Sequence, residues 1–413
     1  MAAKEREDSV FVGLDVGSSK SICVVAAPGR EPGRYRLLGF GSRRSEGVRQ
    51  GVVNDVEAAV GTIRDTIREA QFTSGIPISG VWAAIGGRVL QSRNCAGVAV
   101  LRGQEVTRED VFQAEANARE HALREAEGRT LIKLIPQGYR CGDVIAPRNP
   151  VGLTGQRLEA LVHAIYGSTT NAQNMKRCVE RAGPDLLNYE PHVWAAAQAV
   201  LTDAERVCGA CVVDIGAETT SMSVFAEGVI TFTDVRPWGA DLFTRDLSVV
   251  LGIDLDAAED LKTHRGAADL KDISADEVVQ IESRTSATRF CSRDLLAKTL
   301  QSRAKELFGI CRRVLAAAGI LESVKIVVLT GGGSRLAGID RVAAEVFGRR
   351  VRIGRPMLFE GDTPLLESTD ATVAAGLVRC ADEDALAGGE AKAAAAHMPG
   401  FVRRLRTVFL GDY

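Results

Sequence analysis

Two short apolar runs near the start of the chain are separated by a turn of small polar residues. The first run extends from Val10 to Leu14 and the second from Ile22 to Ala27, and glycine and serine fill the turn between them. Continuous, β-branched runs of this length are typical of buried strands, and Gly-Ser clusters are typical of turns. The pattern therefore predicts a strand, a tight turn and a second strand.

Apolar residues then recur at the period of a helix. Val56, Val60, Ile63 and Ile67 lie three or four positions apart, and Asn54 stands where an N-cap is expected. This spacing predicts a helix over 55–69.

The stretch from 80 to 167 has a different rhythm. Its pattern predicts a strand at 81–85, a polar helix at 108–126, and strands at 130–135 and 158–166. We therefore expect a compact inserted α+β unit. The predicted helix is rich in Glu, Ala and Arg, so one broad face should be wet or meet a partner.

The opening pattern returns in the second half of the chain. CVVDIGAETTSMSVF, from Cys211 to Phe225, echoes FVGLDVGSSKSICVV, from Phe11 to Val25. An internal duplication of this kind usually places two similar halves around a cleft. Further helices are predicted at 175–181, 241–251, 295–318 and 371–378, and a buried strand at 325–329 runs into Gly331, Gly332 and Gly333.

The composition changes near the C-terminus. From 381 to 398 the chain is mostly Ala, Gly, Glu and Asp, which predicts a flexible linker. On a helix beyond it, one apolar arc holds Phe401, Val402, Leu405, Val408 and Phe409, while Arg403, Arg404 and Arg406 lie outside the arc. This pattern favours a short helix on an anionic membrane surface over one that docks on its own domain.

Length and charge narrow the class of protein. At about 150 residues per domain, 413 residues suggest two to four packed units. The net charge of −2 excludes a globally basic nucleic-acid binder. The absence of an apolar signal and the odd count of nine cysteines indicate a reducing cytosol, and without an 18-residue apolar run any membrane contact is expected at the surface. The single CxxC pair, Cys208 and Cys211, is interpreted as core packing.

Three glycine turns carry the groups that a phosphate site needs. Glycine lets backbone N–H groups approach phosphate oxygens, and hydroxyls and lysine add donors and charge. The first turn offers Gly13, Gly17, Ser18, Ser19 and Lys20 beside Asp15, the second offers Asp214, Gly216, Thr219 and Thr220, and the third offers Gly331, Gly332 and Gly333. Asp15 could hold Mg²⁺ through water. Neither a GxGxxG fingerprint nor a P-loop motif is present.

Any one of these turns alone would more often be a structural hairpin, but their order is informative. LDVGSSKS, VVDIGAETT and VLTGGGSRL, with an insertion after the first, resemble the phosphate 1, phosphate 2 and adenosine motifs of the actin, hexokinase and heat-shock chaperone superfamily. That resemblance implies two lobes with ATP bound between them.

Further strings narrow the resemblance. PQGYR from Pro136, NPVGLTGQRLEALVH from Asn149, GVVNDVEAAV from Gly51, VRIGRP from Val351 and the C-terminal tail make almost the entire chain resemble the FtsA family of bacterial cell division proteins. The family implies an α/β, actin-like fold of two lobes with duplicated ribonuclease H-like subdomains, an inserted α+β subdomain and a C-terminal amphipathic helix. The expected units are a first lobe core of 1–80, 168–200 and 355–380 (1A), an insertion of 81–167 (1C), a second lobe core of 201–245 and 322–354 (2A), an outer subdomain of 246–321 (2B), a linker of 381–398 and a membrane helix of 399–413.

The family also implies roles for particular residues. ATP and Mg²⁺ would lie among the three turns, with Asp15 and Asp214 near the metal. Glu259 and Lys262 resemble ribose and adenine contacts, although an exposed intrahelical ion pair fits the same spacing. Glu190 would order a metal-bound water or cap a helix. Arg303 and Glu306 match positions that receive the C-terminal peptide of FtsZ, or they form a solvated ion pair.

One departure bears on activity. In the second turn Ala217 and Glu218 replace glycines, and Ser221, Met222 and Ser223 stand where an aspartate is often found. We therefore expect ATP binding with weak or no turnover. The family resemblance implies a protein that polymerises on the cytoplasmic side of the inner membrane at the septum, anchors the FtsZ ring and helps recruit later division proteins. The alternatives are a small-molecule kinase, which needs a catalytic aspartate and no basic tail, and a pilus-assembly adaptor, which would lack the NPVGL string.

Overall fold

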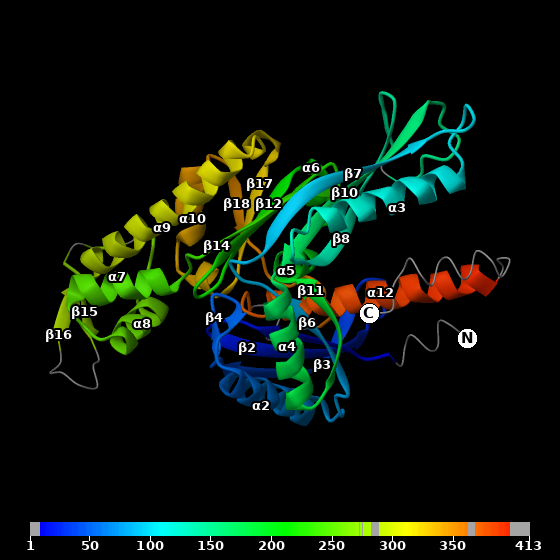
Figure 1. The fold of residues 1–413 in the computed structure, drawn as a ribbon. Coiled ribbons are helices and arrows are strands. Elements are labelled where there is room, and N and C mark those ends of the chain that lie inside the picture. The colour runs from blue at the N-terminus through cyan, green and yellow to red at the C-terminus, as the bar shows by residue number, and fades with distance from the viewer. Residues whose placement is uncertain are drawn as a thin grey trace.

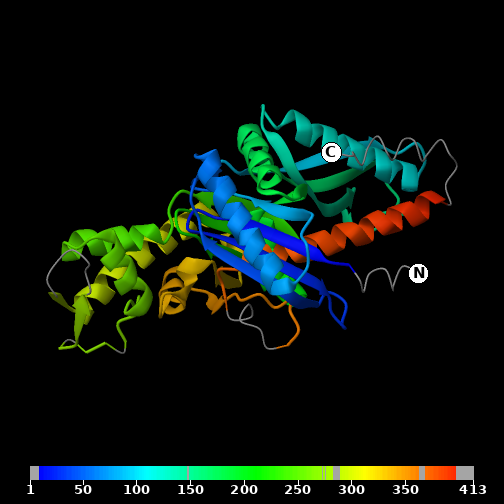
Figure 2. The same cartoon turned by 90° about the horizontal axis from the view of Figure 1, so that it is seen from below.

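The computed structural model describes residues 9–146, 148–271, 273–274, 276–281, 289–361 and 368–396, with side chains described as far as 386. They form two lobes, and a subdomain extends from the first of them (Figure 1). Seen from below, the green-yellow outer part of the second lobe lies at one end of the molecule, and the cyan inserted subdomain lies toward the other (Figure 2).

The first lobe is built on a five-stranded sheet in the order β11-β6-β1-β2-β3. Its strands are β1 (Phe11–Val16), β2 (Lys20–Pro28), β3 (Tyr35–Arg44), β6 (Gly80–Ile85) and β11 (Asp185–Pro191). Helices α2 (Val56–Ser74) and α4 (Thr169–Ala182) pack on one face, and α5 (His192–Val200) and α12 (Thr372–Ala396) pack on the other. A two-stranded ribbon of β4 (Val48–Arg49) and β5 (Val52–Val53) lies beside this core.

The second lobe repeats this plan with the order β14-β13-β12-β17-β18. Its strands are β12 (Ala210–Ile215), β13 (Thr220–Ala226), β14 (Val229–Arg236), β17 (Ile326–Thr330) and β18 (Arg350–Ile353). In both sheets an antiparallel hairpin meets a parallel strand, and Asp15 and Asp214 occupy the same register, opposite Ile22 and Ser221. The predicted duplication is confirmed.

Helices complete the second lobe. The long α9 (Arg293–Ala317) and α10 (Ile339–Phe347) pack against its sheet, the short α6 (Asp203–Cys208) leads into β12, and one-turn helices η1 (Leu321–Ser323) and η2 (Gly332–Arg335) flank β17. The outer part holds α7 (Asp241–Leu251), α8 (Leu255–His264) and the ribbon of β15 (Val278–Ile281) and β16 (Arg289–Ser292). The helix predicted at 241–251 has these bounds, and that predicted at 295–318 is shifted by one or two residues.

The inserted subdomain is a sheet in the order β7-β10-β8-β9 with one helix packed against it. It consists of β7 (Gln91–Val100), α3 (Arg108–Arg124), β8 (Thr130–Cys141), β9 (Val144–Ala146) and β10 (Arg157–Gly167). The polar helix predicted here buries a stripe of small residues, Ala114, Ala118 and Ala122. Its backbone crosses β7 so closely that a Cβ on Gly97 would lie 1.9 Å from the Ala118 nitrogen.

The structure differs from the expectations at three places in the first lobe and its insertion. Asp55, not Asn54, is the N-cap of α2, because its carboxylate accepts the Ala58 N–H at 3.2 Å. Strand β6 pairs in parallel with β1, so the strand predicted at 81–85 belongs to the first sheet and not to the insertion. Strand β7 was not predicted, since QSRNCAGVAV has few large apolar residues.

The C-terminal segment also differs from the expectation. Helix α12 continues through Ala396, where 381–398 were expected to be a flexible linker. Alanine and glutamate are strong helix formers, so a composition that suggests a linker also suits a helix. Its early part stays docked, because Ala381 and Asp382 are buried and the Tyr35 hydroxyl donates to Asp382 at 2.9 Å. The predicted membrane helix, 399–413, lies outside the described residues. None of the helices that the structure describes is long and apolar enough to cross a membrane.

The α5–α12 crossing gives a test of the fold. A Cβ on Gly376 would lie 1.8 Å from the Ala195 carbonyl oxygen. We expect Gly376→Ala to lower the free energy of unfolding by about 2–3 kcal/mol, because the helices must move apart. In the control Gly61→Ala, on α2, the new Cβ meets nothing within 4 Å, and we expect a gain of about 0.5–1 kcal/mol. Urea titration measures both, and equal effects would contradict the close crossing.

Candidate functional site

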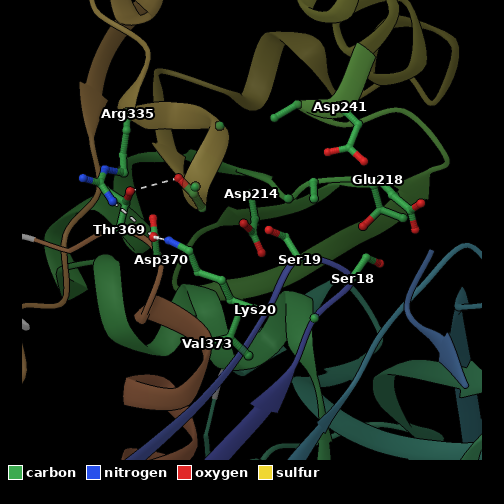
Figure 3. A pocket seen from close by; sticks show the side chains of 18 of the residues that line it. Ser18, Ser19, Lys20, Asp214, Glu218, Asp241, Arg335, Thr369, Asp370 and Val373 are labelled. Atoms are coloured by element: carbon green, nitrogen blue, oxygen red, sulfur yellow. Dashed lines mark hydrogen bonds and ion pairs between the residues drawn. The ribbon is translucent and has the colours of Figure 1, made fainter. Parts of the chain in front are cut away.

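A cleft of about 620 Å³ opens between the two lobes, lined by the three glycine turns (Figure 3). Its walls come from the ends of β1, β12 and β17, and from α7 and α8. Of the predicted nucleotide-binding residues, the structure brings together Asp15, Gly17, Ser18, Ser19, Lys20, Asp214, Gly216, Thr219, Glu259, Lys262, Gly331, Gly332 and Gly333.

The first two turns have the same backbone geometry. The Gly17 N–H donates to the Lys20 carbonyl at 3.0 Å, and the Gly216 N–H donates to the Thr219 carbonyl at 2.8 Å. Each bond closes the tight turn of a β-hairpin, β1–β2 in one lobe and β12–β13 in the other. Two like turns therefore face the cleft from opposite walls.

The third turn lies directly against the second strand pair. Gly331 has φ +80°, and a Cβ there would lie 2.2 Å from Oδ1 of Asp214, so only glycine fits. The hydroxyls of Ser334 and Thr369 donate to the Gly331 carbonyl at 2.7 and 2.9 Å. These bonds hold the start of η2 so that the backbone of its glycines lines the cleft, where a nucleoside could pack against it.

Asp15 and Asp214 dominate the electrostatics of the cleft. Burial, and after it the charge of Asp214, raises the pKa of Asp15 to about 7. Burial raises the pKa of Asp214 to about 6. Neither carboxylate forms an ion pair within the described part of the chain. Two partly buried carboxylates that no described Lys or Arg pairs with are a donor set that suits a hard divalent ion such as Mg²⁺.

The rest of the ligand shell would have to come from elsewhere. No group of three or more His, Cys, Asp or Glu side chains that could enclose a metal exists among the described residues. Mg²⁺ commonly binds through one or two carboxylates, water and substrate phosphates. The cleft therefore fits a metal that arrives with a polyphosphate better than a metal held by protein alone.

Lys20 is engaged by a residue that the sequence did not single out. Its ammonium group bonds the Asp370 carboxylate, and the Arg335 guanidinium reaches the same oxygen at 3.2 Å (Figure 3). The other oxygen, Oδ1 of Asp370, is buried and has no hydrogen-bond partner among the described residues. Asp370 precedes α12, far along the chain from Lys20, and no local pattern marks it.

Glu259 and Lys262 form the ion pair that their spacing allowed, and both side chains also line the cleft. The Lys262 ammonium lies 2.6 Å from the Glu259 carboxylate and donates to the Thr244 hydroxyl at 2.8 Å. Asp241, the first residue of α7, also lines the cleft, and burial raises its pKa. Asp241 was not predicted, because it lies in a loop-to-helix junction without a motif.

Two predicted site residues do not line the cleft. Thr220 is buried and donates its hydroxyl to the Trp238 carbonyl at 2.7 Å. Glu190 is bound instead by Lys133 of the insertion, with 2.5 Å between Nζ and Oε1, and its second oxygen is buried without a partner. Burial raises the pKa of Glu190, against the opposing effect of Lys133. The structure therefore places Glu190 in the joint between lobe and insertion, and its expected role at a metal-bound water stays a prediction.

The predicted peptide-binding pair lies outside the cleft, on α9. Arg303 binds the Asp246 carboxylate of α7 through two N···O contacts of 2.5 and 2.7 Å, and it also bonds Glu306. These contacts raise the pKa of Arg303. Glu306 keeps about half of its side chain exposed, 56%. Asp246 completes the cluster and was missed, since it is remote in sequence.

Two duplicated lobes around a shared cleft define the class of actin-like proteins. The type IV pilus complex "PilM-PilN" matches with a TM-score of 0.64 at 18% identity, covering 89% of this chain and 97% of that one. MreB 5 of Spiroplasma citri bound to AMPPNP matches with a TM-score of 0.56 at 13% identity, covering 93% and 99%. At these identities the likeness establishes the fold.

Sequence comparison identifies the family. The model described as "Cell division protein FtsA" matches residues 211–377, and that of the "SHS2 domain inserted in FTSA" matches 87–166. The cell division protein FtsA of Neisseria meningitidis serogroup B is 33% identical over 384 residues, 91% of each chain. That of Escherichia coli K12 is 30% identical over 416 residues, 98% of each chain. The chain belongs to the FtsA family of actin-like cell division proteins, as its resemblance predicted.

The place of Glu190 can be tested through its partner. We expect Lys133→Met to lower the free energy of unfolding by about 2–3 kcal/mol, because it leaves a buried carboxyl unpaired. Glu190→Gln should cost less, since the amide keeps a hydrogen bond to Lys133. Nucleotide affinity, measured by calorimetry, should change less than about twofold in both. A loss of affinity in Glu190→Gln alone would return that residue to the site.

Proposed function

We propose that this protein binds ATP with Mg²⁺ in the interlobe cleft and uses the nucleotide to control assembly. The observation that carries the proposal is the pair of partly buried carboxylates, Asp15 and Asp214, which lie between two like turns and form no ion pair with the residues that the structure describes. A bound Mg²⁺ supplies positive charge that offsets both the carboxylates and the phosphates.

Each wall has a part in this proposal. Ser18, Ser19 and Lys20 bind phosphate from the first lobe, and Gly216 and Thr219 bind it from the second. Gly332 and Gly333 carry the adenosine, because they begin η2 and line the cleft. Glu259 and Lys262 hold the ribose, with Thr244 fixing the lysine.

Turnover is proposed to be slow or absent. A hydrolase needs a group that activates water near the phosphates. Glu190 is paired with Lys133, and Ser221 and Ser223 are buried within β13. Asp241 lies in the wall of the cleft. A small-molecule kinase would need such an aspartate as its catalytic base, so the kinase alternative depends on this residue.

Membrane attachment is proposed for the C-terminal tail, which lies beyond the described residues. Its arc of large apolar residues and three arginines suits an anionic surface. Each arginine near such a surface contributes about 1 kcal/mol, so one tail binds weakly. Polymerisation of the protein along the inner membrane would hold many tails together and supply the missing affinity.

Two surfaces outside the cleft have proposed partners. The C-terminal peptide of FtsZ is assigned to the cluster of Arg303, Glu306 and Asp246, where charge is already ordered on α7 and α9. Later division proteins are assigned to the inserted subdomain. Together these contacts would anchor the FtsZ ring to the cytoplasmic side of the inner membrane at the septum.

The carboxylate pair predicts a pH dependence of nucleotide binding. Because the pKa values are about 7 for Asp15 and about 6 for Asp214, both must lose protons before they can hold a cation. The affinity for ATP with Mg²⁺ should therefore rise as the pH rises from 6 to 8. Asp15→Asn should weaken binding and flatten this rise. Titration with a fluorescent ATP analogue measures it, and a pH-independent affinity of the unaltered protein would contradict the proposal.

The tail can be tested by pelleting with liposomes. Removal of residues 399–413 should abolish binding to vesicles rich in anionic lipid, and ATP should strengthen binding of the full chain by promoting assembly. A variant with Arg403, Arg404 and Arg406 replaced by lysine keeps the charge and should still bind. Binding that survives removal of the tail would refute the anchor.

A further inference from the structure

Glu218 is one of the side chains that join the two lobes across the cleft. Glu218, in the second phosphate turn, accepts the backbone N–H of Gln50 at 2.6 Å. Gln50 belongs to the first lobe, in the turn between β4 and β5. In Figure 3, Glu218 and Ser18 lie toward one end of the cleft, and Lys20 and Asp370 lie toward the other.

The first-lobe turn that receives Glu218 is held from several sides. The Gly51 N–H donates to the Ser18 hydroxyl at 3.3 Å. Asn171, buried on α4, donates to the Gly51 carbonyl at 3.1 Å and accepts the Val53 N–H at 3.2 Å. A Cβ on Gly51 would lie 2.5 Å from the backbone of Gly87, so two chain segments are in direct contact there. The turn is therefore a fixed part of the first lobe.

Gln50 itself has an unusual backbone conformation. Its φ is +49°, a left-handed value that costs a residue with a side chain roughly 1–2 kcal/mol. Such conformations persist only where the surroundings determine them, and they gather at functional sites. Here the Gln50 carbonyl accepts the Arg88 N–H at 3.3 Å, and the Gln50 N–H donates to Glu218.

Glu218 is anchored equally well in the second lobe. The N–H groups of Ala240 and Asp241 donate to the carbonyls of Gly216 and Ala217, both at 2.8 Å. This fixes the turn that carries Glu218 to the start of α7. A hydrogen bond from an amide to a charged carboxylate is short and strong for its kind. The bond also points the Glu218 carboxylate toward the Gln50 N–H of the first lobe. A negative charge near a polyphosphate repels it, so the orientation of this carboxylate matters for binding.

We propose that Glu218 is a latch between the lobes, which holds the cleft closed at the end where Glu218 and Ser18 lie and slows the release of nucleotide. Opening of the lobes breaks the bond from Gln50 to Glu218, and closing restores it. Because the Gln50 turn abuts Gly87, just ahead of β7, the latch also links the state of the cleft to the root of the inserted subdomain. The effect on release rests on the proposed nucleotide binding, whereas the effect on lobe separation does not.

The lobe separation can be measured without nucleotide. Spin labels would be placed at Phe72→Cys on α2 and Val249→Cys on α7, which are 89% and 81% exposed. A Cys208→Ser background removes the exposed native cysteine, and the other eight are buried. We expect Glu218→Ala to lengthen and broaden the distance distribution between the labels. Glu218→Gln keeps an acceptor oxygen and should lie between Glu218→Ala and the parent protein.

The kinetic consequence is measured separately. Dissociation of a fluorescent ADP analogue, chased with unlabelled ADP in the presence of Mg²⁺, should be about tenfold faster in Glu218→Ala, the factor that corresponds to about 1.4 kcal/mol. Asp256→Asn, an exposed charge removal on α8 of the same lobe, is the matched control and should release at the parent rate.

The outcomes separate the latch from its alternatives. Unchanged distances in a stably folded Glu218→Ala would overturn the latch, whatever the release rate. Slower release with unchanged distances would show that Glu218 acts only by repelling phosphate, and would equally overturn it. If the parent protein binds no nucleotide, the proposed function fails, and the distance measurement still decides whether Glu218 joins the lobes.

Discussion

The desolvation of two carboxylates, Asp15 and Asp214, is the constraint around which the cleft is organised, and the charge of Asp214 adds to its effect on Asp15. Each stands near the end of the first strand of its hairpin, in equivalent register, and each is partly buried. Placing two carboxylates at such a site is unfavourable unless protons or a cation compensate them. The glycines around them make this possible, since a Cβ on Gly331 would collide with Asp214 itself. The strands thus meet at a point that favours positive charge.

The inserted subdomain contacts both lobes, so the lobes are less free to move than two lobes joined by a hinge alone. It is connected to the first lobe in the chain and bound there by the ion pair of Lys133 and Glu190. It also contacts the second lobe, where Asn94 and Gln137 donate to backbone carbonyls of β14 at 2.9 and 2.6 Å. His163 lies behind Asn94, 2.6 Å from its oxygen, and burial lowers the pKa of His163 to about 4, so it is neutral there near neutral pH. Any change in the angle between the lobes must therefore strain or shift this polar seam.

What the sequence predicted well is what local pattern determines. The hairpins around Asp15 and Asp214, the glycines of the third turn and the helix at 241–251 follow from periodicity and turn chemistry. Residues brought in by tertiary structure were missed, because nothing near Asp370 or Asp246 shows which cation each will meet. The partner of Glu190 was missed for a related reason, because Lys133 lies on the insertion, far from Glu190 in the sequence. A flexible linker was expected at 381–398, where the structure has a helix through Ala396, because an alanine-rich composition is typical of linkers and also favours helices.

The contacts of Lys20 connect the cleft with the C-terminal helix. Asp370 binds Lys20 of the first turn and Arg335 of the third, and two residues later α12 begins. The Thr372 hydroxyl, in the first turn of α12, lies 2.8 Å from that of Thr330 at the end of β17. A phosphate that bound Lys20 would leave Asp370 paired with Arg335 alone. The negative charge of Asp370 would then be less well neutralised, and its Oδ1 already has no hydrogen-bond partner among the described residues. Since α12 leads toward the C-terminal tail, its first turn connects the residues of the cleft with that part of the chain.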